Sequence, residues 1–189
     1  MRADALRRRA AIVDAARVLV AERSADVALD AVAALARVGI ATLYRNFESR
    51  AELLDAVSIA ILTDVEAAVA VAREELPVNP AEAWESCLGR LVGMHIGALT
   101  SALAEHARGD LSVEVREAQE RTLGELELLL REAVAAGVAR ADISAVELIV
   151  MVGMIARPQP EGVLRTAPDL AQRAFSVLVE GLRPPRPRS

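Results

Sequence analysis

The fold is decided by residues 38–54, which read VGIATLYRNFESRAELL. The first half of this stretch predicts a short helix over residues 39–46, because Leu43 and Phe47 are four residues apart and would share one inner face. Residues 30–36 predict another short helix, and a turn of only a few residues joins the two. Two short helices joined in this way are typical of a helix-turn-helix.

A longer helix begins directly after this pair. Ser49 and Glu52 form a capping-box pattern, in which the serine oxygen accepts the backbone N–H of Glu52 and the carboxylate accepts the backbone N–H of Ser49. We expect this helix to continue to about Leu76, because Pro77 follows.

The residues before the pair complete a compact unit. Residues 7–23 predict one amphipathic helix. Helices of seven or eight residues are marginal alone, so the two short helices must be held by their neighbours. The expected core of the unit is Ile12, Ala16, Leu19, Val32, Leu35, Leu43 and Phe47.

The rest of the chain also predicts helices and contains no convincing strand. Asn79 as N-cap, Pro80 and Glu82 signal the start of a long helix that reaches about Ala107. Gly137 is a natural residue to end a helix. The other expected segments are helices over residues 113–136, from Ser144 (in a second capping box with Glu147) to before Pro158, and over 168–182, with a loop over 157–167 and a disordered tail over 183–189.

Composition favours helices and divides the charge. Of 189 residues, 53% are hydrophobic but only 2% are aromatic, so the core must consist mainly of aliphatic residues, which suit long helices. The net charge of −5 at first sight argues against nucleic acid. However, residues 1–50 hold nine arginines against six acidic residues, whereas residues 51–189 hold thirteen against twenty-one. The N-terminal part is therefore positive, as phosphate contact requires.

Several classes of function find no support in the sequence. No Ser-His-Asp arrangement, phosphate-binding glycine loop or Cys-His pair can be argued, so we predict no enzyme, no catalytic residue and no cofactor. Two histidines without ligand types at suitable spacing predict no metal site, and the lone Cys87 is expected to be a buried small hydrophobe. The most apolar run, residues 143–156, is too short to span a bilayer, and no signal peptide opens the chain, so we expect a soluble, cytoplasmic protein.

Residues 7–57 resemble the DNA-binding domain of TetR-type transcriptional regulators. The resemblance is carried by residues 21–23 and 30–33, and above all by TLYRNFESR at residues 42–50, followed by an acid and a leucine pair. It implies an all-α, two-domain fold of nine helices, with a three-helix N-terminal domain and a larger helical domain that binds a ligand and dimerises through its last two helices. The expected domains are residues 1–48 and 49–183, with a Pro/Arg-rich tail over 184–189.

The resemblance also implies contacts with DNA. Tyr44 would reach a phosphate through its hydroxyl, and Arg50 would do so at a helix N-terminus, which itself attracts anions. Thr42 would contact a phosphate or a base edge, or only satisfy a backbone group. We expect sparse base readout, with Ile40 against a thymine methyl and DNA shape contributing the rest. The candidate DNA-contacting residues are Arg37, Gly39, Ile40, Thr42, Tyr44, Arg45 and Arg50.

Two positions depart from the family pattern. Arg37 stands in the turn where glycine is usual, so the turn either tolerates another residue or adopts a left-handed conformation at some cost. Ala28 stands where many relatives have a serine or threonine that caps the second helix and reaches a phosphate. The departures keep open an alternative function, a helical homodimeric adaptor with weakened DNA binding.

The larger domain offers two weaker patterns. The helix from residue 80 carries a face that is either ordinary core or the lining of a mostly apolar ligand pocket, formed by Trp84, Leu88, Leu91 and His95. Glycines at positions 89, 93 and 97 indicate either a close helix crossing or space for a ligand. The candidate dimer interface, on the last two long helices, is Ile149, Val152, Gly153, Ala174, Val177 and Leu178.

These patterns together predict a transcriptional regulator that responds to a ligand. We expect a homodimeric repressor that binds a palindromic operator in double-stranded DNA and is released by a largely apolar small-molecule effector.

Overall fold

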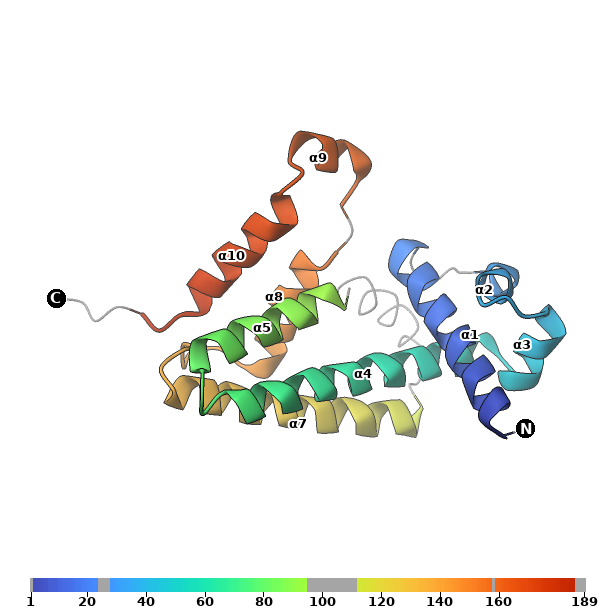
Figure 1. The fold of residues 1–189 in the computed structure, drawn as a ribbon, viewed down its shortest axis with the longest axis horizontal. Helices are drawn as coiled ribbons and strands as arrows, with labels where there is room; N and C mark the ends of the chain where they lie inside the picture. The colour runs from blue at the N-terminus through green and yellow to red at the C-terminus, as the bar shows by residue number, and fades with distance from the viewer. Residues whose placement is uncertain (1, 24–27, 95–111, 158, 186–189) are drawn as a thin grey trace. The chain divides into compact units, whose positions relative to one another are not determined.

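The computed structural model describes residues 2–23, 28–94, 112–157 and 159–185 (Figure 1). Every regular element in these ranges is a helix, and nine helices lie within them, which confirms the expected fold class. They are α1 (Arg2–Arg23), α2 (Leu29–Leu35), α3 (Ile40–Asn46), α4 (Arg50–Glu75), α5 (Pro80–Gly93), α7 (Val113–Ala135), α8 (Ala145–Ile155), α9 (Glu161–Thr166) and α10 (Leu170–Leu182).

The chain forms two compact units, and α4 and α7 contribute residues to both. The first unit comprises residues 1–61 and 98–118, and the second comprises residues 62–97 and 119–189. The expected domain limits, after residues 48 and 183, refer to independently folding regions and not to these two contact-based units. These limits stay predictions.

The first unit packs α1 to α3 around an apolar core. Every expected core residue is buried except Leu35, which is 48% exposed. The expectation for Leu35 is wrong because α1 and α3, which contact α2, leave Val32 and Ala33 near its middle buried but its last residue, Leu35, open to solvent. In addition, α1 begins at Arg2 instead of residue 7, since residues 2–6 contain no glycine or proline that would end it.

The start of α4 differs from a standard capping box in one bond. The N–H of Glu52 donates to the Ser49 hydroxyl at 3.1 Å, as expected. The Glu52 carboxylate, however, accepts the N–H of Glu48 at 2.7 Å instead of the N–H of Ser49. The carboxylate therefore ties down the residue before the cap, and the turn between α3 and α4 is fixed from both sides.

In the second unit, α4 and α7 run parallel and are joined by polar contacts. Arg73 forms ion pairs with Glu125 and Glu132, each with an N···O distance of 2.8 Å. The hydrogen bond from Arg73 holds the pKa of Glu132 below its usual value. Nearer the start of both helices, the hydroxyl of Thr122 on α7 donates a hydrogen bond of 2.8 Å to the carboxylate of Glu66 on α4. These polar side-chain contacts fix the position of α7 along α4.

The helix from Pro80 is shorter than expected. α5 ends at Gly93, whereas the sequence predicts a helix to Ala107, whose later part lies outside the described residues. Asn79 is the N-cap residue, but its side chain donates to the Glu82 carboxylate instead of accepting a backbone N–H. The start position is therefore correct and the expected capping bond is not.

The connection from α7 to α8 follows the sequence signals. Gly137 adopts a φ of +73°, the left-handed conformation that ends α7. Ser144 and Glu147 form both bonds of the expected capping box at the start of α8. Between these positions, the N–H of Arg140 donates to the carbonyl oxygen of Leu182 at 2.8 Å, which anchors the end of α10 to this connection.

The expected loop over residues 157–167 contains a helix. α9 (Glu161–Thr166) begins after Pro160, whose φ of −57° suits the entry to a helix, and Glu161 forms an i,i+4 ion pair with Arg165. The expectation of a loop is wrong because Pro160 is the N-cap of this short helix and Gly162 is its second residue, and Pro158 lies outside the described residues.

Candidate nucleic-acid interface

The turn between α2 and α3 uses a strained residue. Arg37 has a φ of +55°, in the left-handed region that favours glycine. The backbone N–H groups of Arg37 and Val38 donate to the carbonyls of Ala34 and Ala33 at 3.1 and 3.0 Å, so α2 ends as a helix with a glycine C-terminus would. Of the two possibilities left open by the sequence, the left-handed turn is therefore the one that occurs, with arginine in the glycine position.

α3 has one buried face and one exposed face. Leu43 and Phe47 are completely buried, as expected for core residues. Ile40 and Tyr44, which are also four residues apart, are 38% and 53% exposed. Their spacing of four places Ile40 and Tyr44 together on the outer face of α3.

The other candidate DNA-contacting residues surround this face. Gly39 is the N-cap of α3 and is exposed, and Arg45 is exposed near its last turn. Thr42 is half-buried, and its carbonyl accepts the side-chain N–H of Asn46 at 2.7 Å. Arg50 is half-buried as the first residue of α4.

The start of α2 lacks the side-chain cap, as the sequence predicts. Ala28 is the N-cap residue, with extended backbone angles and no side chain that could accept a hydrogen bond. Its carbonyl accepts the N–H groups of Ala31 and Val32 at 3.0 and 3.2 Å, so the helix still starts here. The site therefore has one capping bond fewer than a serine would provide.

The candidate pocket residues that the structure describes lie on α5. Trp84, Leu88 and Leu91 are all buried, and His95 lies outside the described residues. Trp84 lines a hollow of about 320 Å³, together with Ala81, Glu85, Gly137, Val138, Val179, Arg183 and Pro184. Its indole N–H is buried and has no hydrogen-bond partner in the described part of the chain. Leu88 and Leu91, by contrast, are completely buried core residues that do not line this hollow.

Cys87 lies on the same helix as Trp84 and is buried, as expected. Burial raises the pKa of its thiol to about 11. The thiol is therefore protonated at neutral pH and behaves as a small apolar side chain.

The candidate dimer residues divide between the core and the surface. Val152 and Gly153 are buried within the chain, Ile149, Ala174 and Leu178 are half-buried, and Val177 is 72% exposed. The sequence reasoning missed the exposed apolar stripe of α8, formed by Val146, Val150 and Met154 at a spacing of four. The spacing of four was the sequence signal for this stripe. Because α8 is apolar on nearly all sides, the sequence did not show which of its faces is buried in the chain.

Neither a metal site nor a membrane-spanning helix is found among the described residues. No group of three or more histidine, cysteine, aspartate or glutamate side chains could hold a metal ion among the described residues. Within the same ranges, no helix combines the length and apolar character that crossing a membrane requires.

Family models match both parts of the chain. The model described as bacterial regulatory proteins of the tetR family matches residues 12–57. The model described as the C-terminal domain of SbtR-like transcriptional regulators matches residues 79–184. Among curated protein sequences, none matches the chain.

Solved structures with the same fold cover almost the whole chain. A TetR transcriptional regulator from Streptomyces coelicolor is 30% identical with a TM-score of 0.64, over 93% of this chain and 98% of the other. A TetR regulatory protein from Mycobacterium vanbaalenii is 28% identical with a TM-score of 0.65, over 96% and 98% of the two chains. The ketosteroid transcriptional regulator KstR2 of Mycobacterium tuberculosis, 17% identical over 93% and 95% of the two chains, shares the fold with a TM-score of 0.60.

Proposed function

Since the chain belongs to the TetR family of transcriptional regulators, we propose that it is a repressor that binds a palindromic operator as a homodimer and is released by a small effector. The observation that carries the DNA-binding part is the outer face of α3, where Ile40 and Tyr44 are exposed above the buried Leu43 and Phe47. The half-buried Arg50 at the start of α4 favours DNA over the protein partner of an adaptor, because a cation at a helix N-terminus suits a phosphate.

Phosphate contacts position the protein in this proposal, and few side chains read bases. Tyr44 and Arg50 bind phosphates, with the N-terminus of α4 adding backbone N–H groups. Ile40 contacts a thymine methyl, and Arg37, Thr42 and Arg45 reach polar groups, while the exposed backbone of Gly39 lets the duplex approach closely. With few base-reading side chains, sequence preference depends partly on DNA shape.

The test is to select duplexes from a random DNA pool with the purified protein and to sequence them. We expect an inverted repeat, because a two-fold dimer requires two half-sites. Affinity for the selected duplex should fall steeply between about 50 and 200 mM salt, since bound phosphates release counterions. Recovery of no enriched sequence, together with binding that does not depend on salt, would favour the adaptor.

The hollow beside Trp84 is the proposed effector site in the second unit. Its walls are mostly apolar, the indole N–H offers an unsatisfied donor, and Arg183 and Glu85 add charge. The ligand class that fits is a small apolar molecule with a hydrogen-bond acceptor. Because Trp84 is the only tryptophan of the chain, its fluorescence reports occupancy directly.

The effector test uses 1-anilinonaphthalene-8-sulfonate as the probe, an aromatic anion whose sulfonate oxygens accept hydrogen bonds. Binding in the hollow should quench Trp84 and reduce the affinity for the selected duplex. Val138→Phe, which narrows the hollow and leaves Trp84 as the only tryptophan, should abolish the quenching, whereas Val78→Phe, at an exposed site, should leave it. Equal quenching in both variants would place the probe elsewhere.

No catalytic role, cofactor or metal is part of the proposed function, and the proposed location is the cytoplasm, where the operator DNA of a bacterial regulator is found.

A further inference from the structure

Arg9 lies where α1 meets the end of α3 and the start of α4. Its Nη1 atom donates a hydrogen bond of 2.6 Å to the carbonyl oxygen of Asn46, the last residue of α3. Its guanidinium carbon stands 4.1 Å from the centroid of the Phe47 ring. The same Nη1 atom lies 3.7 Å from a carboxylate oxygen of Glu52, in the first turn of α4. One side chain thus contacts the end of one helix, the junction and the next helix.

These contacts meet a physical need of α3. A helix of seven residues is marginal alone, and its last carbonyls have no partners within the helix. A cation at the C-terminus satisfies a carbonyl and is attracted by the helix dipole. The cation–π contact adds to this, because the Phe47 ring that accepts it is completely buried and cannot move away.

The contacts of Arg9 continue on both sides of the junction. Asn46, whose carbonyl binds Arg9, donates its side-chain N–H to the carbonyl of Thr42 at 2.7 Å. Glu52, the ion-pair partner, accepts the N–H of Glu48 at 2.7 Å. Arg9 therefore belongs to a connected set of contacts that extends from the middle of α3 to the first turn of α4.

We propose that Arg9 is a positioning residue for DNA binding, which rests on the proposed function. In the sequence, Tyr44 precedes and Arg50 follows the two junction residues that Arg9 contacts. By fixing Asn46 and Phe47 on α1, Arg9 sets the spacing between the Tyr44 hydroxyl and the Arg50 guanidinium, so that both reach phosphates without further ordering. The guanidinium itself stays on the protein and does not bind DNA.

Preorganisation of this kind increases affinity without a new contact, because ordering the junction has been completed before DNA arrives. A direct phosphate contact by Arg9 would instead release a counterion. The two roles therefore differ in the salt dependence of binding, since each neutralised phosphate contributes about 0.9 to the slope of log affinity against log salt.

The experiment compares three variants on the selected duplex over the same salt series. Arg9→Met keeps the aliphatic stem and removes the donors, and Arg9→Lys keeps the charge and one donor. Arg7→Met is the matched control, because Arg7 is an exposed residue of α1 whose ion pair is with Asp4. We expect Arg9→Met to lower affinity about tenfold, which corresponds to one hydrogen bond from a charged donor at a partly exposed site.

The slope against salt should be the same for Arg9→Met as for the wild type, and Arg9→Lys should restore part of the affinity. A slope that is less steep by about one counterion would overturn the proposal, because it assigns Arg9 to a phosphate. So would an Arg9→Met protein with wild-type affinity, or with a loss no larger than that of Arg7→Met. Circular dichroism measures whether each variant is folded. If Arg9→Met does not fold, Arg9→Lys takes its place, and several-fold weaker binding with an unchanged salt slope in that variant would support the proposal.

Amide hydrogen exchange in the protein without DNA gives an independent measurement. Exchange over residues 42–50 should be about tenfold faster in Arg9→Met than in the wild type or in Arg7→Met, because the junction opens more often. Unchanged exchange overturns the positioning role. If the wild type selects no duplex at all, the proposed function fails, and the exchange data then show separately whether Arg9 holds the junction.

Discussion

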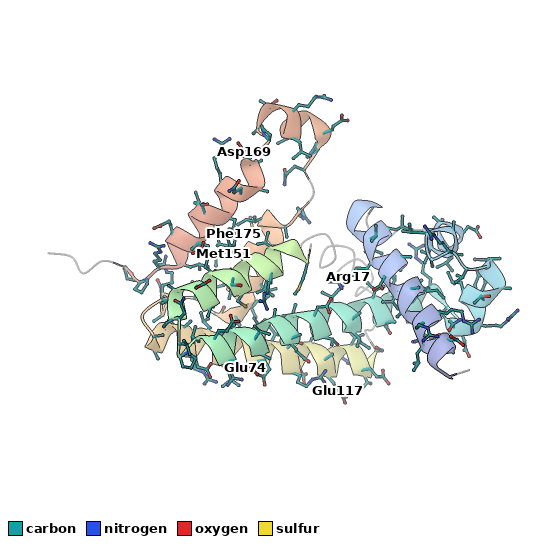
Figure 2. All side chains as sticks on the ribbon, viewed as in Figure 1. Arg17, Glu74, Glu117, Met151, Asp169 and Phe175 are labelled. Carbon is teal, nitrogen blue, oxygen red and sulfur yellow. The ribbon has the colours of Figure 1, made fainter. Side chains whose placement is uncertain are left out.

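The ring of Phe175 on α10 lies against Gly89 on α5, with its Cζ atom 3.6 Å from the point that a Cβ atom on Gly89 would occupy. Figure 2 labels Phe175 on α10 and Met151 on α8, and α10 contacts both α5 and α8. Gly93, one turn further along α5, has no such neighbour within 4 Å in the described part of the chain. The two glycines that looked alike in the sequence therefore differ, since Gly89 serves a helix crossing and Gly93 faces open space.

This difference predicts unequal tolerance of large side chains. Gly89→Leu should lower the free energy of unfolding by about 1–3 kcal/mol, because the added atoms overlap the Phe175 ring. Gly93→Leu, the matched control, should cost less than about 0.5 kcal/mol. Gly89→Ala should be neutral or stabilising by up to about 1 kcal/mol, as 3.6 Å is an ordinary contact distance and alanine favours helix. Urea unfolding followed by circular dichroism measures all three, and equal effects of leucine at both positions would contradict the crossing.

Arg37 combines backbone strain with a proposed DNA contact, and two substitutions separate them. Both Arg37→Gly and Arg37→Ala remove the guanidinium, but only glycine relieves the φ of +55°. Arg37→Gly should therefore be more stable than Arg37→Ala by about 1 kcal/mol. The two should have the same reduced salt slope for operator binding if the guanidinium binds a phosphate. Thermal unfolding and binding isotherms check the two parts independently, and a slope equal to that of the wild type would show that Arg37 binds no phosphate and leave only its proposed contact with polar groups.

The missing cap of α2 can be restored. Ala28→Ser should raise the free energy of unfolding by about 0.5–1 kcal/mol, because the hydroxyl can accept a free backbone N–H of the first turn. Ala28→Asp should stabilise the helix as well, but its negative charge should repel phosphate. Serine should therefore tighten operator binding while aspartate weakens it, as measured by fluorescence anisotropy. If both substitutions shift the affinity in the same direction, Ala28 is not near the DNA backbone.

The Tyr44 hydroxyl has a testable role of its own. Tyr44→Phe should reduce operator affinity by about three- to tenfold, the worth of one hydrogen bond to a charged acceptor at an exposed site. Stability should be unchanged within about 0.5 kcal/mol, since the ring is 53% exposed and the hydroxyl supports no buried group. The salt slope should stay as in the wild type, because a neutral hydroxyl releases no counterion. Unchanged affinity would show that Tyr44 only covers the surface.

The sequence predicts local signals well and packing poorly. The capping box at Ser144, the left-handed Gly137 and the buried pair Leu43 and Phe47 all depend on short-range geometry, and the structure confirms them. The exposure of Leu35 depends on which face of a seven-residue helix turns inward, and that is fixed by α1 and α3.

The contacts of Arg9 could not be predicted at all. They join residues 37 positions apart in the chain, and one of them is to a backbone carbonyl, which leaves no trace in the sequence. The α8 stripe was missed for a different reason. A helix that is apolar on all sides does not reveal which side its own core covers, so Val152 and Gly153 could not be distinguished from Val150 and Met154.

The capping box at the start of α8 predicts a dependence on acid. The bonds from the Ser144 N–H and hydroxyl lower the pKa of Glu147 below its ordinary value of 4.5. A carboxyl whose folded pKa is lowered stabilises the protein above its unfolded pKa, and this contribution disappears as the pH falls through the folded pKa. Glu147→Gln should therefore reduce stability at neutral pH but lose less on acidification below 4.5 than the wild type. Glu120→Gln, on the exposed side of α7, controls for the loss of one charge, and parallel acid curves for all three proteins would contradict the prediction.

The exposed stripe of α8 gives the sharpest test of self-association. Val146, Val150 and Met154 are 55%, 54% and 68% exposed, and they lie along one line at a spacing of four. In a two-fold dimer each stripe would pack on its equivalent, so Val150→Glu places two carboxylates in an apolar interface. Sedimentation equilibrium should show a dimer for the wild type and a monomer for this variant. Val78→Glu makes the same change at a residue that is 87% exposed in a turn, and it should remain dimeric. Because a palindrome needs both half-sites, the monomeric variant should also lose most operator affinity, whereas a dimeric Val150→Glu protein would exclude this stripe from the interface.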